Sequence, residues 1–176
     1  MAEIKSTLDL VLEKTSHLTM SSKEKAQQRD AELQRKLRGF LQKYEDGLMT
    51  RDQVEKAWNE LDGAGSLERH PMWILEIASR LDLDGDTGPL LDLLENGCGV
   101  SVGEVEAVVT DYRSALRAKG VEKTREMTAD LAAAGIRGDA VIPNVSGDPD
   151  FNENIKALKS EHEKRLHRIF RQFTDG

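Results

Sequence analysis

Three aspartates in the segment LDLDGDTGPLLDLLENG (residues 81–97) have the spacing of calcium ligands. An EF-hand loop needs oxygen ligands at its first, third and fifth positions, glycine at the sixth and glutamate at the twelfth. A loop that begins at Asp82 includes Asp84 and Asp86, but it has Thr87 at the sixth position and Leu93 at the twelfth. A loop that begins two residues later ends on a glutamate but has proline at the sixth position. We therefore predict an inter-helix turn, and keep weak divalent-cation binding by the three carboxylates as a third hypothesis for function.

The same turn contains Asp86-Thr87-Gly88, which resembles the active-site triplet of the aspartic proteases. In that family the triplet follows an apolar strand, and two such aspartates share one proton. Here the triplet follows LDLDG, lies between predicted helices and occurs once. We expect no protease site. Asp86 or Thr87 is instead predicted to cap the next helix, with Pro89 in its first turn.

The segment HEKRLH (residues 162–167) differs by one residue from the zinc-binding motif H-E-x-x-H. On a helix that turns ~100° per residue, ligands four positions apart project about 40° apart, whereas His162 and His167 project about 140° apart. The two rings therefore cannot bind one metal ion from one helix. His162 falls within an apolar stripe and is predicted to be a packing residue.

Residues 93–109 (LLENGCGVSVGEVEAVV) resemble a DNA-binding helix–turn–helix in the spacing of the turn glycine and the apolar positions. The helix that would enter the major groove begins with Glu104, Glu106 and Asp111, and its first basic residue is Arg113. Carboxylates oppose phosphate binding, and no arginine, asparagine or glutamine is placed to contact base edges. A DNA-binding regulator that uses residues 89–119 is the alternative hypothesis, but we do not expect nucleic acid to bind.

Cys98 lies between two glycines just before a predicted helix, a position that can lower a thiol pKa. No base accompanies it in the sequence, so a role as a small packing residue is favoured. The sequence contains no other arrangement typical of a catalytic site, a phosphate loop or a cofactor motif. We predict a protein that is not an enzyme and has no cofactor.

The composition is that of a folded, helix-rich protein: 38% of the residues are hydrophobic and 32% are charged. Charge is unevenly distributed around the net value of −7. Eleven acidic residues and two arginines lie between Asp62 and Asp111, whereas six lysines and arginines and three glutamates lie between Glu153 and Phe173. This distribution allows electrostatic contact between the two regions, within or between chains. We find no membrane span and no signal peptide, and one cysteine cannot form an internal disulfide, so a cytoplasmic location is expected.

Capping boxes and glycines set the predicted helix ends. The boxes are Ser21 with Glu24, Thr50 with Gln53, and Ser101 with Glu104; the glycines are Gly47, Gly63, Gly97, Gly120 and Gly135. The predicted helices cover residues 2–15, 22–46, 51–61, 71–81, 89–96, 102–119, 122–134 and 151–173. The one candidate strand is DAVIPN (139–144).

The predicted fold is all-α, with a central helical bundle and long amphipathic N- and C-terminal helices. MWILEIA (72–78) and LLDLL (90–94) are apolar almost all round and should form the centre of the core. A stripe on the following helix should face them; it comprises Val105, Val108, Val109, Tyr112 and Leu116. We divide the chain into an N-terminal helix and hairpin (1–62), a central core (63–134), a hinge (135–150) and a C-terminal helix (151–176).

Residues 33–61 form the pattern helix, glycine, LMT, helix, and resemble the short helical hairpin called SHOCT. The resemblance covers this segment alone and implies a local interaction or oligomerisation element.

Two helices carry narrow apolar stripes that must be covered by something. The predicted interaction residues are Leu33, Leu37, Phe40 and Tyr44 on helix 22–46, and Ile155, Leu158, His162, Ile169 and Phe173 on helix 151–173. The stripes can cover each other in one chain or meet across a two-fold axis, and we favour the homodimer. The leading hypothesis is therefore a non-enzymatic protein that mediates protein–protein interaction and associates with itself.

Overall fold

The computed structural model describes residues 21–61, 66–67, 70–138 and 140–175. It confirms an all-α helical bundle, with no strand in those ranges. The elements are α2 (Ser22–Glu45), α3 (Arg51–Asn59), α4 (Pro71–Arg80), α5 (Gly88–Asp92), the π-helix η2 (Leu93–Gly97), α6 (Gly103–Ala133), the 3-10 turn η3 (Val145–Gly147) and α7 (Pro149–Asp175). The predicted helix 2–15 and the helix end at Gly63 lie outside the described residues.

Two of the three predicted capping boxes form. The Ser21 hydroxyl accepts a hydrogen bond from the backbone N–H of Glu24, whose carboxylate accepts one in return, and Thr50 and Gln53 repeat this arrangement before α3. Gly47 has a φ of 70° in the turn between α2 and α3. A residue with a Cβ rarely adopts this left-handed conformation, so glycine makes the reversal between the two helices possible.

The core lies where α2, α3, α4, α5, η2 and the first half of α6 meet. It contains the segments predicted to be central; their fully or nearly buried side chains are Trp73, Ile74, Ile77, Leu90, Leu91, Leu93 and Leu94. The predicted stripe on α6 faces them, with Val105, Val108, Val109 and Tyr112 buried and Leu116 partly buried. Trp58 of α3 is fully buried as well and meets Trp73 edge to face, with ring centroids 5.3 Å apart. One hydrophobic cluster thus joins elements from the whole described chain.

The predicted capping box at Ser101 is wrong. α6 begins at Gly103, its N-cap is Val102, and no side chain caps it. Val100 and Val102 are both buried, so their packing sets this turn and leaves Ser101 exposed. Burial of two valines outweighs one exposed capping hydrogen bond, which contributes about 1 kcal/mol.

The end of the preceding helix also differs from the prediction. The residue with left-handed backbone is Gly99, with a φ of 65°, rather than Gly97. Gly97 matters for a different reason: a Cβ there would lie 2.8 Å from Cδ1 of the fully buried Leu93, whose side chain would have to shift. Gly135 has a φ of 85° and ends α6 as predicted.

The predicted break between helices 102–119 and 122–134 does not occur, because α6 is continuous through Gly120. Glycine inside a helix costs about 1 kcal/mol relative to alanine, which neighbouring contacts can offset. One such contact is the salt bridge of Lys123 with Asp148, whose nitrogen and oxygen lie 2.9 Å apart. The candidate strand 139–144 is likewise absent from its described residues, as expected for one short strand without a partner.

Gly120→Ala is expected to raise the free energy of unfolding by up to about 1 kcal/mol, because it removes the entropic cost of glycine inside a helix. A Cβ at Gly120 would meet no atom within 4 Å, so no steric cost opposes the gain. Urea unfolding measures the change. Gly97→Ala is the matched comparison and should destabilise the protein; a destabilised Gly120→Ala variant would contradict the continuous α6.

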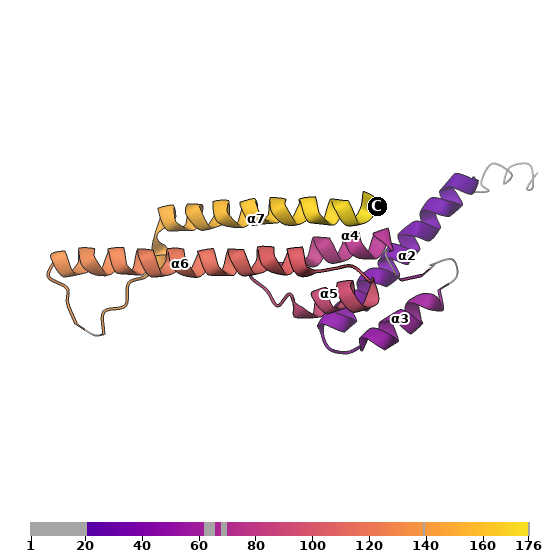
Figure 1. The fold of residues 1–176 in the computed structure, drawn as a ribbon, viewed down its shortest axis with the longest axis horizontal. Helices are drawn as coiled ribbons and strands as arrows, with labels where there is room; N and C mark the ends of the chain where they lie inside the picture. Colours follow the sequence, from indigo (N-terminus) through magenta and orange to yellow (C-terminus); the bar gives the residue numbers. More distant parts are fainter. Residues whose placement is uncertain (1–20, 62–65, 68–69, 139, 176) are drawn as a thin grey trace, which may run out of the picture.

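α7 runs back along α6 and then packs against α4, so it joins the core to a long two-helix hairpin (Figure 1). The C-terminal end of α6 extends past the start of α7, and residues 134–138 and 140–148 lie between the two helices in the chain. We call residues 113–151 the arm. Among the described helices, none has both the length and the apolar character needed to cross a membrane.

Candidate functional site

The apolar stripe of α2 lies in the chain's own core. Leu33 and Leu37 are buried, and Phe40 and Tyr44 pack against the same cluster. The sequence analysis missed Leu41, which is fully buried too. The Tyr44 hydroxyl donates a hydrogen bond to Asp92, and burial together with this carboxylate raises the pKa of Tyr44 to about 12.

Ion pairs fix α2 on α4. Arg38 donates to both carboxylate oxygens of the buried Glu76 at 3.1 Å, and Arg80 lies between Glu76 and Glu45, 2.6 Å from the latter. Burying Glu76 is tolerable only because two guanidinium groups accompany it. The α2 stripe is therefore covered by α3, α4 and α5 of the same chain.

The stripe of α7 is covered in the same way, by α6 and α4. The partly buried residues of the predicted set are Ile155, Leu158, Ile169 and Phe173, and His162 is buried. His162 is a packing residue, as predicted. Its Nδ1 lies 2.8 Å from the Leu158 carbonyl oxygen, and its ring meets Tyr112 at 5.6 Å between centroids. The two stripes thus lie on the core of one chain, and the reason for pairing them across a two-fold axis is removed.

The acidic turn that resembles a calcium loop contacts a lysine of α7. The Lys159 ammonium lies 2.7 Å from Asp82 and 2.5 Å from Asp84. The Tyr112 hydroxyl donates to the other oxygen of Asp84 at 2.6 Å, while Asp86 accepts from the backbone N–H of Gly88. The predicted side-chain cap does not form, because the N-cap of α5 is Thr87 and no side chain caps this helix, although Pro89 lies in its first turn as predicted. Arg165 and Asp111, which lie 3.0 Å apart, form a further ion pair, so the contact that the charge distribution allows between the acidic middle and the basic end occurs within one chain.

These contacts shift the pKa values of the groups involved. Hydrogen bonds from Lys159 lower the pKa values of Asp82 and Asp84, and the two carboxylates raise that of Lys159. Burial and the bond to Asp84 raise the pKa of Tyr112 to about 12. The turn thus already holds a cation, the side chain of Lys159. A calcium ion would have to displace it, so we expect calcium to leave the thermal stability nearly unchanged.

Lys159→Met is expected to lower the free energy of unfolding by about 1 kcal/mol near neutral pH, since partly exposed ion pairs contribute little each. Asp82 and Asp84 have lowered pKa values in the folded state, so their contribution is present above the ordinary value of 3.8 and is lost as the pH falls below it. The difference in the free energy of unfolding between the wild-type protein and the variant should therefore become smaller in acid.

Urea unfolding of both proteins at neutral and acid pH measures this difference. Lys156→Met, an exposed position on the same helix, is the control and should change little. A difference for Lys159→Met that persisted in acid would contradict the ion-pair account, because methionine keeps an apolar chain of similar length and the substitution chiefly removes the charge.

The region that resembles a helix–turn–helix is a structural corner. Cys98 is fully buried there, and burial raises the pKa of its thiol to about 12, so the hypothesis of a lowered pKa is wrong. Glu104 and Glu106 lie exposed in the first turn of α6, as the sequence suggested. No group of three His, Cys, Asp or Glu residues in the described ranges is arranged to hold a metal ion.

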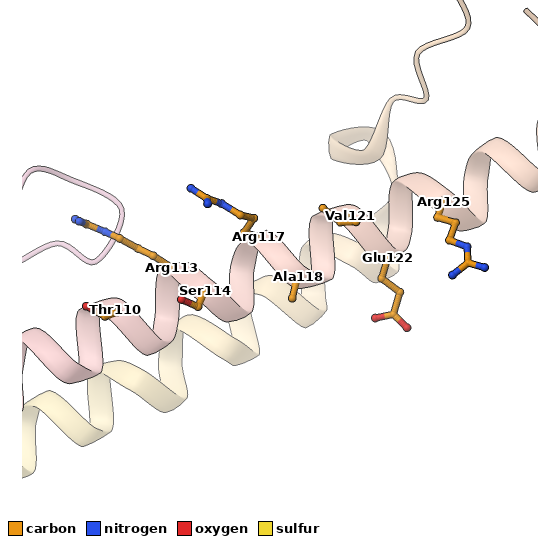
Figure 2. Close-up of a pocket in the computed structure, with 8 residues that line it drawn as sticks. All are labelled: Thr110, Arg113, Ser114, Arg117, Ala118, Val121, Glu122 and Arg125. Atoms are coloured by element: carbon orange, nitrogen blue, oxygen red, sulfur yellow. The ribbon is translucent and has the colours of Figure 1, made fainter. Parts of the chain in front are cut away.

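The outer face of α6 is a surface that the sequence analysis missed. A shallow depression runs along it, and all the lining residues come from α6: Thr110, Arg113, Ser114, Arg117, Ala118, Val121, Glu122 and Arg125 (Figure 2). This face lies about 180° around the helix from Val105 and Tyr112, which enter the core. We call these eight residues the outer face. The helical spacing of these residues on both sides of Gly120 is visible in the sequence. The predicted helix end at Gly120 divided them between two helices, so they were not recognised as one face.

The charges of the outer face are mostly unpaired. Arg113 donates to the Leu83 and Gly85 carbonyl oxygens and so holds the acidic turn. Within the described part of the chain, Arg117, Glu122 and Arg125 make no ion pair or hydrogen bond. Val121 between them is 66% exposed. The outer face thus offers an apolar residue bordered by free charges of both signs.

Next to it, a second groove lies between α6 and the returning segment of the arm. It includes Val121, Pro143, Val145 and Phe151. Ile136 and Ile142 are exposed further along the same segment. Three exposed large apolar side chains, those of Val121, Ile136 and Ile142, therefore lie on the arm.

Comparison of the chain with models of protein families, with curated proteins and with solved structures gave no match. The resemblance of residues 33–61 to SHOCT therefore gains no support from these comparisons. A functional proposal for this chain rests on the surfaces described above.

Proposed function

We propose that this chain is a non-enzymatic, cytoplasmic helical protein that binds protein and associates with itself. The observation that carries the proposal is the exposure of Val121, Ile136 and Ile142 on the arm. Single exposed apolar side chains are ordinary on any protein surface, but a group of them marks a contact surface more often. The buried free thiol of Cys98 suits a reducing compartment.

The proposed contact differs from the one expected from the sequence. Leu37 and His162 are committed to the core and are not available to another chain. The arm extends away from that core, and its outer face is accessible along two turns and more of α6. Contact through the arm leaves the core of each copy unchanged.

Light scattering over a range of micromolar concentrations tests the proposal. The mass should rise with concentration from 19.6 kDa toward twice that value. Val121→Asp should weaken the association, because it places a charge among apolar contacts. Leu75→Asp is the matched control, as Leu75 is also an exposed apolar residue but lies on α4. A monomer at every concentration would refute self-association.

A further inference from the structure

The outer face of α6 has the residue spacing of a coiled-coil seam. Positions 114, 118, 121 and 125 alternate in steps of four and three and lie within an arc of about 60°. In heptad terms Ala118 and Arg125 occupy a, and Ser114 and Val121 occupy d. Ser114 and Ala118 are small and exposed, so the backbone of another helix can approach closely.

The free charges flank this seam on opposite sides. Arg117 corresponds to the g position and Glu122 to the e position of the next heptad. Figure 2 shows their side chains projecting to opposite sides of α6. In a parallel pair of helices, a residue at g lies beside the e residue of the next heptad in its partner, and charges at these positions set partner choice and orientation.

We infer that two copies of this chain pair through the outer faces of their α6 helices, parallel and in register. Arg117 of each copy then lies beside Glu122 of the other, which forms two equivalent ion pairs about the two-fold axis. Val121 and Ala118 meet their own counterparts between these pairs. This inference rests on the proposed function, since it names the surface and geometry of the proposed self-association.

Charge complementarity selects both the occupant and its direction. A face with a positive residue at g and a negative residue at the next e is complementary to a second copy of itself. A second copy can therefore pair both charges, and no other partner is needed. In an antiparallel pair, g faces g and e faces e, so Arg117 and Glu122 would not meet. Arg125 at a permits a two-stranded pair but lowers its stability, as single polar a residues do. The association is therefore weak and depends on concentration.

Charge reversal tests the ion pairs. Arg117→Glu alone and Glu122→Arg alone should each weaken association at least tenfold, measured by sedimentation equilibrium, because like charges then face each other twice. The double variant should restore association to within a few-fold of the wild-type value. Arg168→Glu, an exposed position on α7, is the control and should have little effect. Circular dichroism checks that each variant remains helical.

Disulfide trapping tests the register. Ala118→Cys is made in a Cys98→Ala background and treated with oxidised glutathione. Two copies of an a residue in a parallel pair lie close enough for a disulfide, so a covalent dimer should form. Ala157→Cys, at an exposed alanine of α7 and in the same background, should form no covalent dimer.

The outcomes separate this inference from the proposed function. A wild-type protein that is monomeric at all concentrations overturns both. A wild-type dimer that neither responds to charge reversal nor forms the disulfide at Ala118→Cys overturns the α6 pairing alone. Loss of association in both single variants with recovery in the double variant supports the pairing.

Discussion

Leu37→Glu is expected to unfold the protein at ordinary temperature or to leave it barely folded. Leu37 is fully buried where α2 meets the rest of the core. Truncating such a leucine costs about 2–5 kcal/mol, and a buried unpaired carboxylate adds to this, against a typical total of about 5–15 kcal/mol. Thermal unfolding followed by circular dichroism measures the loss.

The control for this substitution is Leu48→Glu, at a leucine that is 73% exposed in the turn between α2 and α3. It should change the free energy of unfolding by no more than about 0.5 kcal/mol. The result also decides between two roles of the α2 stripe. A Leu37→Glu variant with wild-type stability and a smaller mass in solution would contradict core packing and would restore the stripe as a dimer seam.

Tyr112→Ala is expected to lower the free energy of unfolding by about 3–5 kcal/mol, as for other large aromatic truncations. The ring is fully buried at the junction of α6 and α7, and its edge meets His162. Its hydroxyl donates to Asp84, so one residue joins both long helices to the acidic turn. Urea unfolding of the wild-type protein and the variant gives the difference.

Tyr112→Phe separates the two contributions of this residue. It keeps the ring and removes only the hydrogen bond to Asp84, so its cost should be about 1–2 kcal/mol. Asp84 retains its contact with Lys159 in this variant. If Tyr112→Phe were as damaging as Tyr112→Ala, the hydrogen bond rather than ring packing would hold the junction together.

Local signals in the sequence predicted much of this fold. The capping boxes at Ser21 and Thr50 each involve residues three positions apart, so they can be recognised without tertiary structure. The apolar stripe through Val105 and Tyr112 reflects helix periodicity alone and was predicted correctly. The charge counts allowed contact between the acidic middle and the basic end, but they did not show whether it would form within one chain or between two.

The errors arise where distant contacts outweigh local preference. The helix at Gly120 continues because the cost of one glycine is small compared with the contacts on either side of it. The individual ion pair of Lys159 with Asp82 could not be predicted, since it joins residues 77 positions apart. Burial of Val102 moved the start of α6 away from Ser101, which looked like a good cap.

The same reasoning explains why the proposed contact surface differs from the one expected from the sequence. An amphipathic stripe shows that a helix face is covered, but the sequence does not show whether its own chain or another covers it. Here the chain covers both stripes with its own core. The outer face of α6 is less apolar than either stripe, so hydrophobic periodicity does not distinguish it in the sequence.

Hydrogen–deuterium exchange at low and high protein concentration tests the central claim most directly: the predicted stripes are internal and the arm is the contact surface. Protection of the backbone amides of residues 110–125 from exchange should increase with protein concentration. The backbone amides of α2 and α7 should be protected equally at both concentrations. Protection that increased with concentration in α2 or α7, and not in residues 110–125, would contradict this account.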